Sequence, residues 1–257
     1  MCSTCDLYGG MIRGFSFINR DYDRVGKNWT LFFERSESNL HFLIHPYEIY
    51  SSEIDAPYIG KLVVTNSDLS TLWTSRVKHV LHLLEEGYDV IHSDLDAIWI
   101  KDPLPEITSL DSDIVFSQGT IFPNKMVRNF GFVLCCGFFF IKSSAKTIQF
   151  VKEWVRLSEI YKDDQVAINE IIQSIAFKPE DKCQNILSYR DHEFMVWEKP
   201  IVIPNDTGIK ISLLSHNSVR RLVENIDSKI SVAHPLSGKT GVETEKCLRD
   251  LGLWILQ

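Results

Sequence analysis

The 257-residue sequence lacks the features that would assign it to a membrane, secreted or fibrous class of protein. Its longest uncharged apolar stretch runs from Phe130 to Ile141, which falls short of the roughly 18 residues that a membrane-spanning helix needs. The N-terminus has no basic region followed by an apolar one, so no secretory signal is expected. There is no internal repeat and no low-complexity segment. As the sequence stands, we expect a cytoplasmic protein without a membrane span.

Excess positive charge and a disulfide framework are missing as well. Lys and Arg number 27 against 34 Asp and Glu, and a net charge of −7 argues against nonspecific binding of nucleic acid. Six cysteines in this length do not form a disulfide scaffold. Cys2 and Cys5 form a CxxC, but no second pair stands near to complete a zinc site. With 44% hydrophobic residues the chain has enough material for an ordinary core.

The residues that are present alternate between strand and helix patterns. Strands are expected where short apolar runs stand between turn residues, and helices where apolar residues recur at helical spacing. The strands predicted are Gly14 to Asn19, Leu40 to His45, Lys61 to Thr65, Asp89 to Ile100, Asp113 to Ser117, Cys136 to Lys142, Ile209 to Leu214 and Lys229 to Val232. The helices predicted are Tyr22 to Arg35, Leu69 to Glu86, Lys146 to Ile160, Gln165 to Ile175 and Glu243 to Leu251. This order predicts an α/β fold with a mostly parallel, mixed central sheet flanked by helices.

The sharpest local feature is His92-Ser93-Asp94-Leu95-Asp96 at the end of an apolar strand. Ligands of α/β sheets bind at the carboxyl ends of the strands, which puts Asn19, Asp94 and Asp96 on one edge. Two carboxylates one residue apart disfavour joint ionisation, and a divalent cation reverses that penalty. Oxygen ligands suit Mg²⁺ or Mn²⁺. Alternatively, one carboxylate caps a turn and the other is simply solvated.

Two classes of enzyme place a D-x-D motif in this way. In nucleotide-sugar glycosyltransferases a metal ion bridges the motif and a diphosphate leaving group. In phosphohydrolases of the haloacid-dehalogenase type, the first Asp is a nucleophile on the first strand of the domain. Here the motif comes after a full strand–helix–strand region, and Ala97 and Ile98 follow it, which favours the first class.

The chain resembles a retaining GT-A glycosyltransferase of the nucleotide-diphospho-sugar transferase family, which includes plant rhamnogalacturonan-II xylosyltransferases and extensin arabinosyltransferases. The resemblance covers roughly Phe15 to Trp254 and rests on several motifs in the family's order. They are Asn19-Arg-Asp-Tyr22 with Asn28-Trp29, Arg76 before the acidic motif, Gly87 to Pro103 (GYDVIHSDLDAIWIKDP), Cys136-Gly-Phe-Phe139, Asp164-Gln165 with Asn169, and His234 to Lys239 (HPLSGK).

This resemblance implies a metal centre and a donor site. Asp94, Asp96 and His234 would hold Mn²⁺ or Mg²⁺ against the diphosphate of a UDP-sugar. Lys239 would contact the β-phosphate as a compact point charge. Asn19, Tyr22 and Arg76 would belong to the donor-binding group. For His234 a purely structural role is the alternative, and for Lys239 a solvated surface position.

The resemblance also implies where transfer takes place. Asp164 and Gln165 would lie under the sugar ring and stabilise the positive charge at the anomeric carbon. Alternatively, the acidic residues there only favour a helix N-terminus. Gln118 and Gly137 would contact the substrate. The sequence departs from the family at Cys135, where the family has an Asn that contacts the sugar.

The function implied is metal-dependent, retaining transfer of a galactose, xylose or arabinose class sugar from a UDP-sugar to a hydroxyl of a glycan, protein or lipid. A single domain over 1–257 is expected, with a nucleotide-binding half, 1–103, and a sugar and acceptor half, 104–257. Many members of the family are anchored in the Golgi, so a trimmed catalytic domain would work in the Golgi lumen. The alternatives are a phosphohydrolase with Asp94 as nucleophile and a non-catalytic binder of nucleotide sugars or glycans.

Overall fold

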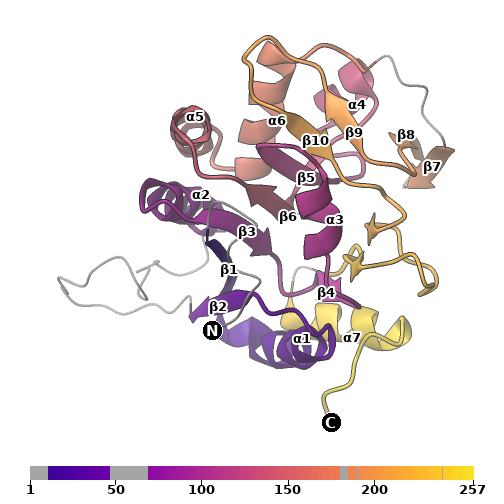
Figure 1. Cartoon of the computed structure of the whole chain (residues 1–257). Coiled ribbons are helices and arrows are strands. Elements are labelled where there is room, and N and C mark those ends of the chain that lie inside the picture. The colour runs from indigo at the N-terminus through magenta and orange to yellow at the C-terminus, as the bar shows by residue number, and fades with distance from the viewer. Residues whose placement is uncertain (1–10, 47–68, 180–184, 190, 239) are drawn as a thin grey trace.

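A central sheet of seven strands organises the fold, which a computed structural model describes for residues 11–46, 69–179, 185–189, 191–238 and 240–257 (Figure 1). Across the sheet the strand order is β2-β1-β3-β6-β5-β10-β9. These strands are β1 (Ile12–Ile18), β2 (His41–Pro46), β3 (Asp89–Ser93), β5 (Ile114–Gln118), β6 (Leu134–Ile141), β9 (Ile201–Ile203) and β10 (Ile211–Leu213). Strands β1, β2, β3, β5 and β10 run in one direction, and β6 and β9 run in the other. The mixed, mostly parallel sheet expected from the sequence is therefore confirmed.

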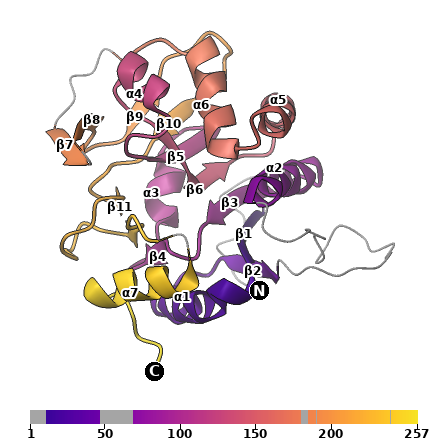
Figure 2. The same cartoon turned by 180° about the vertical axis from the view of Figure 1, so that it is seen from behind.

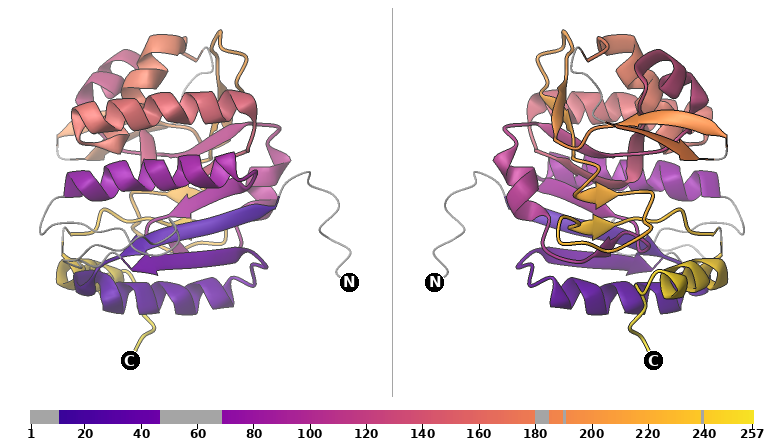
Figure 3. Two further views of the ribbon diagram at one scale, coloured as in Figure 1. Left: turned by 90° about the vertical axis from the view of Figure 1, so that its left-hand side faces the viewer. Right: turned by 90° about the vertical axis from the view of Figure 1, so that its right-hand side faces the viewer.

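Helices cover both faces of this sheet because successive residues of its strands point to opposite sides. Ile114 and Phe116 of β5 pack in a core with the helices of one face, whereas Val115 between them packs in the core of the other face. The helices are α1 (Asp23–Arg35), α2 (Leu69–Glu85), α3 (Leu104–Ser109), α4 (Asn124–Phe130), α5 (Ala145–Tyr161), α6 (Asp164–Ile175) and α7 (Gly241–Asp250), with a 3-10 turn, η1 (Arg20–Tyr22). Figures 2 and 3 show α2 and α5 together on one side of the sheet and α1 beside α7 on the other.

A second, small sheet brings the last part of the chain back to the middle of the sequence. It consists of β11 (Val219–Arg220), β12 (Val232–Ala233) and β4 (Ile98–Trp99) in the order β11-β12-β4. Strand β12 runs antiparallel to β4, with Ala233 opposite Ile98. A separate hairpin is formed by β7 (Asn185–Tyr189) and β8 (His192–Val196).

The predicted elements are largely found, with one clear error. The strand expected over Asp89 to Ile100 is wrong, because the chain leaves β3 after Ser93, turns at Asp94 to Ala97 and then forms β4. The strand expected over Lys61 to Thr65 lies outside the described residues. The sequence patterns missed α3, α4, β9, β11 and the β7–β8 hairpin. None of the described helices is long and apolar enough to cross a membrane.

Candidate active site

The turn between β3 and β4 carries the two acidic residues of the D-x-D motif. Buried hydrogen bonds fix this turn: the indole N–H of Trp29 donates to the carbonyl oxygen of Ala97 at 2.9 Å, and the Ala97 N–H donates to the carbonyl oxygen of Asp94 at 3.0 Å. Ala97 is fully buried, whereas the Asp94 side chain is 37% exposed. The apolar flanks of the motif anchor the turn in the core and leave its carboxylates open.

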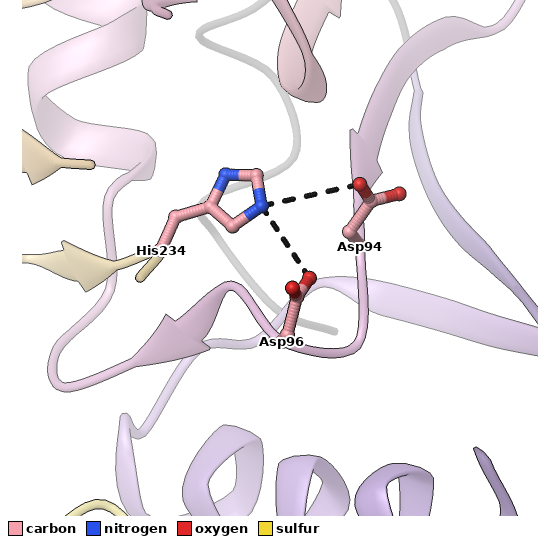
Figure 4. A group of neighbouring side chains, drawn as sticks. All are labelled: Asp94, Asp96 and His234. Atoms are coloured by element: carbon pink, nitrogen blue, oxygen red, sulfur yellow. Dashed lines mark ion pairs between the residues drawn. The ribbon is translucent and has the colours of Figure 1, made fainter. Parts of the chain in front are cut away.

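His234 joins these carboxylates from the far end of the chain because it follows β12, which pairs with β4. Its Nε2 lies 3.4 Å from Asp96 Oδ1 and 4.0 Å from Asp94 Oδ2 (Figure 4). One ligand atom from each of the three residues can be chosen so that all lie within 4.8 Å of one another. Two ligands of one ion lie within about 4–5 Å of each other, since metal–ligand bonds are roughly 2.0–2.3 Å long.

The charges of Asp94, Asp96 and His234 indicate which kind of ligand these residues fit. Burial and the nearby Arg221 lower the pKa of His234, but Asp96 outweighs both and the pKa is raised to about 9. Burial raises the pKa of Asp96, but His234 opposes it and the pKa is lowered below its ordinary value. In the chain alone a protonated imidazole therefore balances two carboxylates. Two carboxylates and an imidazole are a donor set that suits a divalent ion such as Mn²⁺, so these residues fit a metal centre.

Gly137 of β6 lies directly beneath this centre. A Cβ atom added to Gly137 would lie 2.1 Å from Cε1 of His234 and 2.6 Å from Oδ2 of Asp94, which no real contact allows. The carbonyl oxygen of Gly137 also accepts the backbone N–H of Asp94 at 2.7 Å. The sequence predicted a substrate contact for Gly137; the structure gives it close packing against the candidate metal ligands.

Arg76 of α2 joins the acidic turn to the start of α6. Its Nη1 donates to Oδ1 of Asp94 at 2.9 Å, and its Nε donates to Oδ2 of Asp164 at 2.6 Å. Nη1 also lies 3.2 Å from Nε2 of His92, whose Nδ1–H donates to the carbonyl oxygen of Phe15, since a carbonyl can only accept. The predicted donor-site arginine therefore contacts both acidic groups that the family motifs single out.

Asp164 and Gln165 stand at the N-terminus of α6, whose cap is the Asp163 carboxylate. Asp164 is only 1% exposed, and burial raises its pKa to about 6 although Arg76 opposes the shift. The Gln165 amide is held at both ends: Oε1 accepts the N–H of Cys136 at 3.2 Å, and Nε2 donates to the carbonyl oxygen of Phe122 at 2.8 Å. Helix capping by Asp163 and the placement of Asp164 and Gln165 thus occur at the same end of α6.

A cavity of about 360 Å³ opens over this region, a size typical of small-molecule sites. Five of the predicted site residues line it: Asn19, Tyr22, Arg76, Asp94 and Asp96. Asn19 Oδ1 accepts the Tyr22 N–H at 3.0 Å, and the Tyr22 hydroxyl lies 3.1 Å from Oγ1 of Thr244 in α7. Both residues therefore shape the wall as well as face the cavity.

Gln118 and Lys239 are the two remaining site residues predicted from the sequence. Gln118 is 1% exposed, and its amide donates to the carbonyl oxygens of Trp197 and Leu214 while its oxygen accepts the N–H of Trp197. These backbone contacts engage both ends of the amide and tie β5 to the following strands. They lend no support to the substrate contact expected there. Lys239 lies outside the described residues.

Sequence reasoning missed three residues near the centre. The Ser237 hydroxyl donates to Oδ2 of Asp96, and its place within three residues of His234 could have suggested it. Trp73 lines the cavity, although its helical spacing predicted a core position. Arg221 donates from Nη1 to the carbonyl oxygen of His234 at 3.2 Å, and no local sequence signal distinguishes it from Arg220, which pairs with Asp227.

Comparison with known proteins identifies the family of this chain. Residues 50–238 match the family described as nucleotide-diphospho-sugar transferase, and the chain belongs to that family. It is 31% identical over 113 residues to a UDP-galactose:fucoside alpha-3-galactosyltransferase of Dictyostelium discoideum, a match that covers 42% of this chain and 16% of that protein. It is 25% identical over 134 residues to an uncharacterized protein of Arabidopsis thaliana, covering 51% of this chain and 38% of the relative. The chain thus spans less than half the length of these curated relatives.

Solved glycosyltransferases are similar at lower identity. The glycosyltransferase GlyE of Streptococcus pneumoniae is 15% identical with a TM-score of 0.45, covering 67% of this chain and 45% of that one. The galactosyltransferase LgtC, solved with donor and acceptor sugar analogues, is 14% identical with a TM-score of 0.39, covering 63% of this chain and 70% of that one.

Proposed function

We propose that this chain is a metal-dependent, retaining glycosyltransferase that moves a sugar from a UDP-sugar to a hydroxyl acceptor. The observation that carries the proposal is the meeting of His234 with Asp94 and Asp96, two residues that line the cavity, in a chain of the nucleotide-diphospho-sugar transferase family. This geometry brings together residues some 140 positions apart, between His234 and the acidic turn, in the way that a shared cation requires.

Asp94, Asp96 and His234 would hold Mn²⁺ or Mg²⁺. When bound, the ion would act as a Lewis acid that neutralises negative charge on the departing diphosphate. Trp73 and Phe17 line the same cavity and offer an apolar wall to the nucleotide base, and Tyr22 and Asn19 shape its other side. Lys239 would bind phosphate oxygens that face away from the ion.

Asp164 and Gln165 would act on the sugar. In a retaining transfer the acceptor attacks the face from which the nucleotide leaves, and positive charge develops at the anomeric carbon. A buried carboxylate and a fixed amide oxygen stabilise such charge without reorganising. Gln165 is partly exposed, unlike the buried Gln118. Its contacts with Cys136 and Phe122 fix the amide before substrate arrives, and Oε1 keeps a second lone pair, which supports this role.

The donor sugar is proposed from the galactose, xylose and arabinose class. UDP-galactose is the first to test, because the Dictyostelium relative is named for its use of that donor. A glycan, protein or lipid hydroxyl would be the acceptor.

A panel of UDP-sugars tests the proposal. With Mn²⁺, UDP should raise the melting temperature of the protein, and one donor should be hydrolysed slowly to release UDP. Proton NMR of the transferred sugar should show an α-anomer from an α-linked donor, and a β-anomer would contradict retention. Release of inorganic phosphate from simple phosphomonoesters would indicate the phosphohydrolase. Stabilisation by UDP without turnover of any donor would indicate a binder.

A further inference from the structure

We infer that two residues of an irregular segment of β6, Cys135 and Gly137, form the seat that orients the His234 ring, and that Cys135 is a positioning residue for it. The inference rests on the proposed metal centre. It assigns a role to the residue at which this chain departs from the family motif.

The irregular segment arises from a break in the pairing of β5 with β6. Phe116 of β5 pairs with Phe139, but the next residue, Ser117, pairs with Cys135, so Cys136 to Phe138 have no partner residue on β5. The Ser117 hydroxyl donates to the carbonyl oxygen of Phe138 at 3.0 Å and fills part of the gap. A strand irregularity of this kind re-aims side chains and is common beside functional sites.

The two ends of this segment contact different sides of the imidazole. Gly137 lies against Cε1 and Nε2, where only a hydrogen side chain fits. Cys135, which is 4% exposed, places Sγ 3.9 Å from Nδ1 of His234. The ring is thus confined from two sides: Cys135 lies at Nδ1, and Gly137 lies at Cε1 and Nε2, beside the Asp94 carboxylate.

The role of the Cys135 thiol would be to accept the hydrogen on Nδ1 of His234. A neutral imidazole that ligates through Nε2 carries its hydrogen on Nδ1, and the group accepting that hydrogen sets the orientation of the ring. Sulfur is a weak acceptor, and Sγ of Cys135 lies at the Nδ1 side of the ring, where it can take this hydrogen. Nδ1 has no other hydrogen bond within the part of the chain that the structure describes. Cys135 therefore occupies the position that a carboxylate or carbonyl oxygen takes in many metal sites.

The test measures binding of Mn²⁺ alone, by the electron paramagnetic resonance signal of the free ion, without nucleotide. Cys135→Ala should weaken Mn²⁺ affinity by about 10- to 100-fold, the usual effect of removing a partner of a metal-binding imidazole. Cys135→Ser should restore part of the affinity, since a hydroxyl can also accept the hydrogen. Cys136→Ala is the matched control: it removes the neighbouring buried thiol, which packs in the core on the helix α2, α5 and α6 face, and should leave the affinity within twofold.

A second measurement uses the unaltered protein. Nitrogen-15 NMR of the imidazoles, with the protein saturated with diamagnetic Mg²⁺, should show His234 protonated at Nδ1 and not at Nε2. A proton at Nε2 would overturn the inference, whatever the variants do.

The outcomes separate this inference from the proposed function. If the unaltered protein binds no Mn²⁺, the proposed metal centre fails. If it binds Mn²⁺ and Cys135→Ala binds it equally well, the centre stands and the role of Cys135 is refuted. Equal loss in Cys135→Ala and Cys136→Ala would show a general packing effect and would also refute the role.

Discussion

Asp94 and Asp164 share the guanidinium of Arg76, yet they lie in opposite surroundings. The Asp94 side chain is 37% exposed at the cavity, and although burial of its polar atoms works to raise its pKa, Arg76 prevails and holds it below the ordinary range. Asp164 is almost fully buried, and there burial prevails over the same guanidinium and raises the pKa to about 6. One carboxylate is therefore kept charged at the cavity, while the other titrates just below neutral pH.

The site therefore has two electrostatic parts, an open one at Asp94 and a buried one at Asp164, with the guanidinium of Arg76 between them. A divalent ion needs carboxylates that stay ionised, and the turn after β3 supplies them at an open edge. A group that meets developing positive charge benefits from a dry, low-dielectric place, where its field is less screened. Arg76 lets both kinds of carboxylate exist a few ångströms from each other.

Removal of a carboxylate from the open part of the site should have the largest effect. Asp96→Ala should abolish Mn²⁺ binding and reduce transfer by about 100-fold or more, because stabilisation of the leaving diphosphate is a large part of such catalysis. Titration calorimetry with UDP, with and without Mn²⁺, checks this. Asp111→Ala, which removes an exposed carboxylate paired with Lys210, is the control. Unchanged metal dependence of UDP binding in Asp96→Ala would contradict the assignment.

Gly137→Ala should damage the metal centre and leave the Arg76–Asp164 pair in place. The new methyl group overlaps His234 and Asp94, and overpacking of this kind costs about 1–3 kcal/mol of stability. We expect a folded protein with a lower melting temperature and a Mn²⁺ affinity reduced by at least about 10-fold, by analogy with misplaced metal ligands. Circular dichroism and Mn²⁺ titration together check this. A folded variant with normal affinity would show that the close packing is not needed.

Asp164→Asn should affect the buried part of the site, where Asp164 pairs with Arg76. The variant should keep Mn²⁺ and UDP binding and lose about 10²- to 10³-fold in kcat, because the lost charge matters most in the transition state. Asp163→Asn, which keeps a good helix cap, is the matched control. A rise in KM without loss of kcat would place Asp164 in donor binding instead.

The raised pKa of Asp164 also gives a pH dependence with a definite sign. Activity of the unaltered protein should increase as pH rises through about 6, where this carboxyl ionises. Stability should change in the opposite sense: a carboxyl whose pKa is raised on folding stabilises the protein fully below its unfolded pKa, and that contribution disappears as pH rises through about 6. Both effects should be absent from Asp164→Asn in rate profiles and denaturant titrations between pH 4 and 8.

A substitution in the cavity wall should have the smallest effect. Tyr22→Phe removes the hydroxyl that contacts Thr244 and should cost about 0.5–1.5 kcal/mol, the net value of one hydrogen bond. Mn²⁺ affinity should stay the same. Urea unfolding and Mn²⁺ titration check the two statements, and a loss of metal binding would mean that the wall and the metal centre are coupled.

The alternation of strands and helices, and the two candidate metal-binding carboxylates, could be predicted from the sequence. Local patterns decide these features: apolar residues at helical spacing define α2 and α5, and two carboxylates after an apolar strand mark Asp94 and Asp96. The sequence could not show that the strand expected over Asp89 to Ile100 breaks at Asp94. An apolar run on both sides of the motif reads as one strand, and only burial of Ala97 and the contact from Trp29 make a turn there.

The residues that contact those carboxylates could not be predicted from local sequence, because they come from distant segments of the chain. His234 reaches them because β12 pairs with β4, and such a long-range pairing leaves no local mark on either segment. The contact of Arg76 with both Asp94 and Asp164, the close packing of Gly137 and the backbone contacts of Gln118 depend in the same way on elements distant in sequence. Residue type and local spacing fix which groups are available, but distances between groups on different elements follow from how the sheets and helices pack.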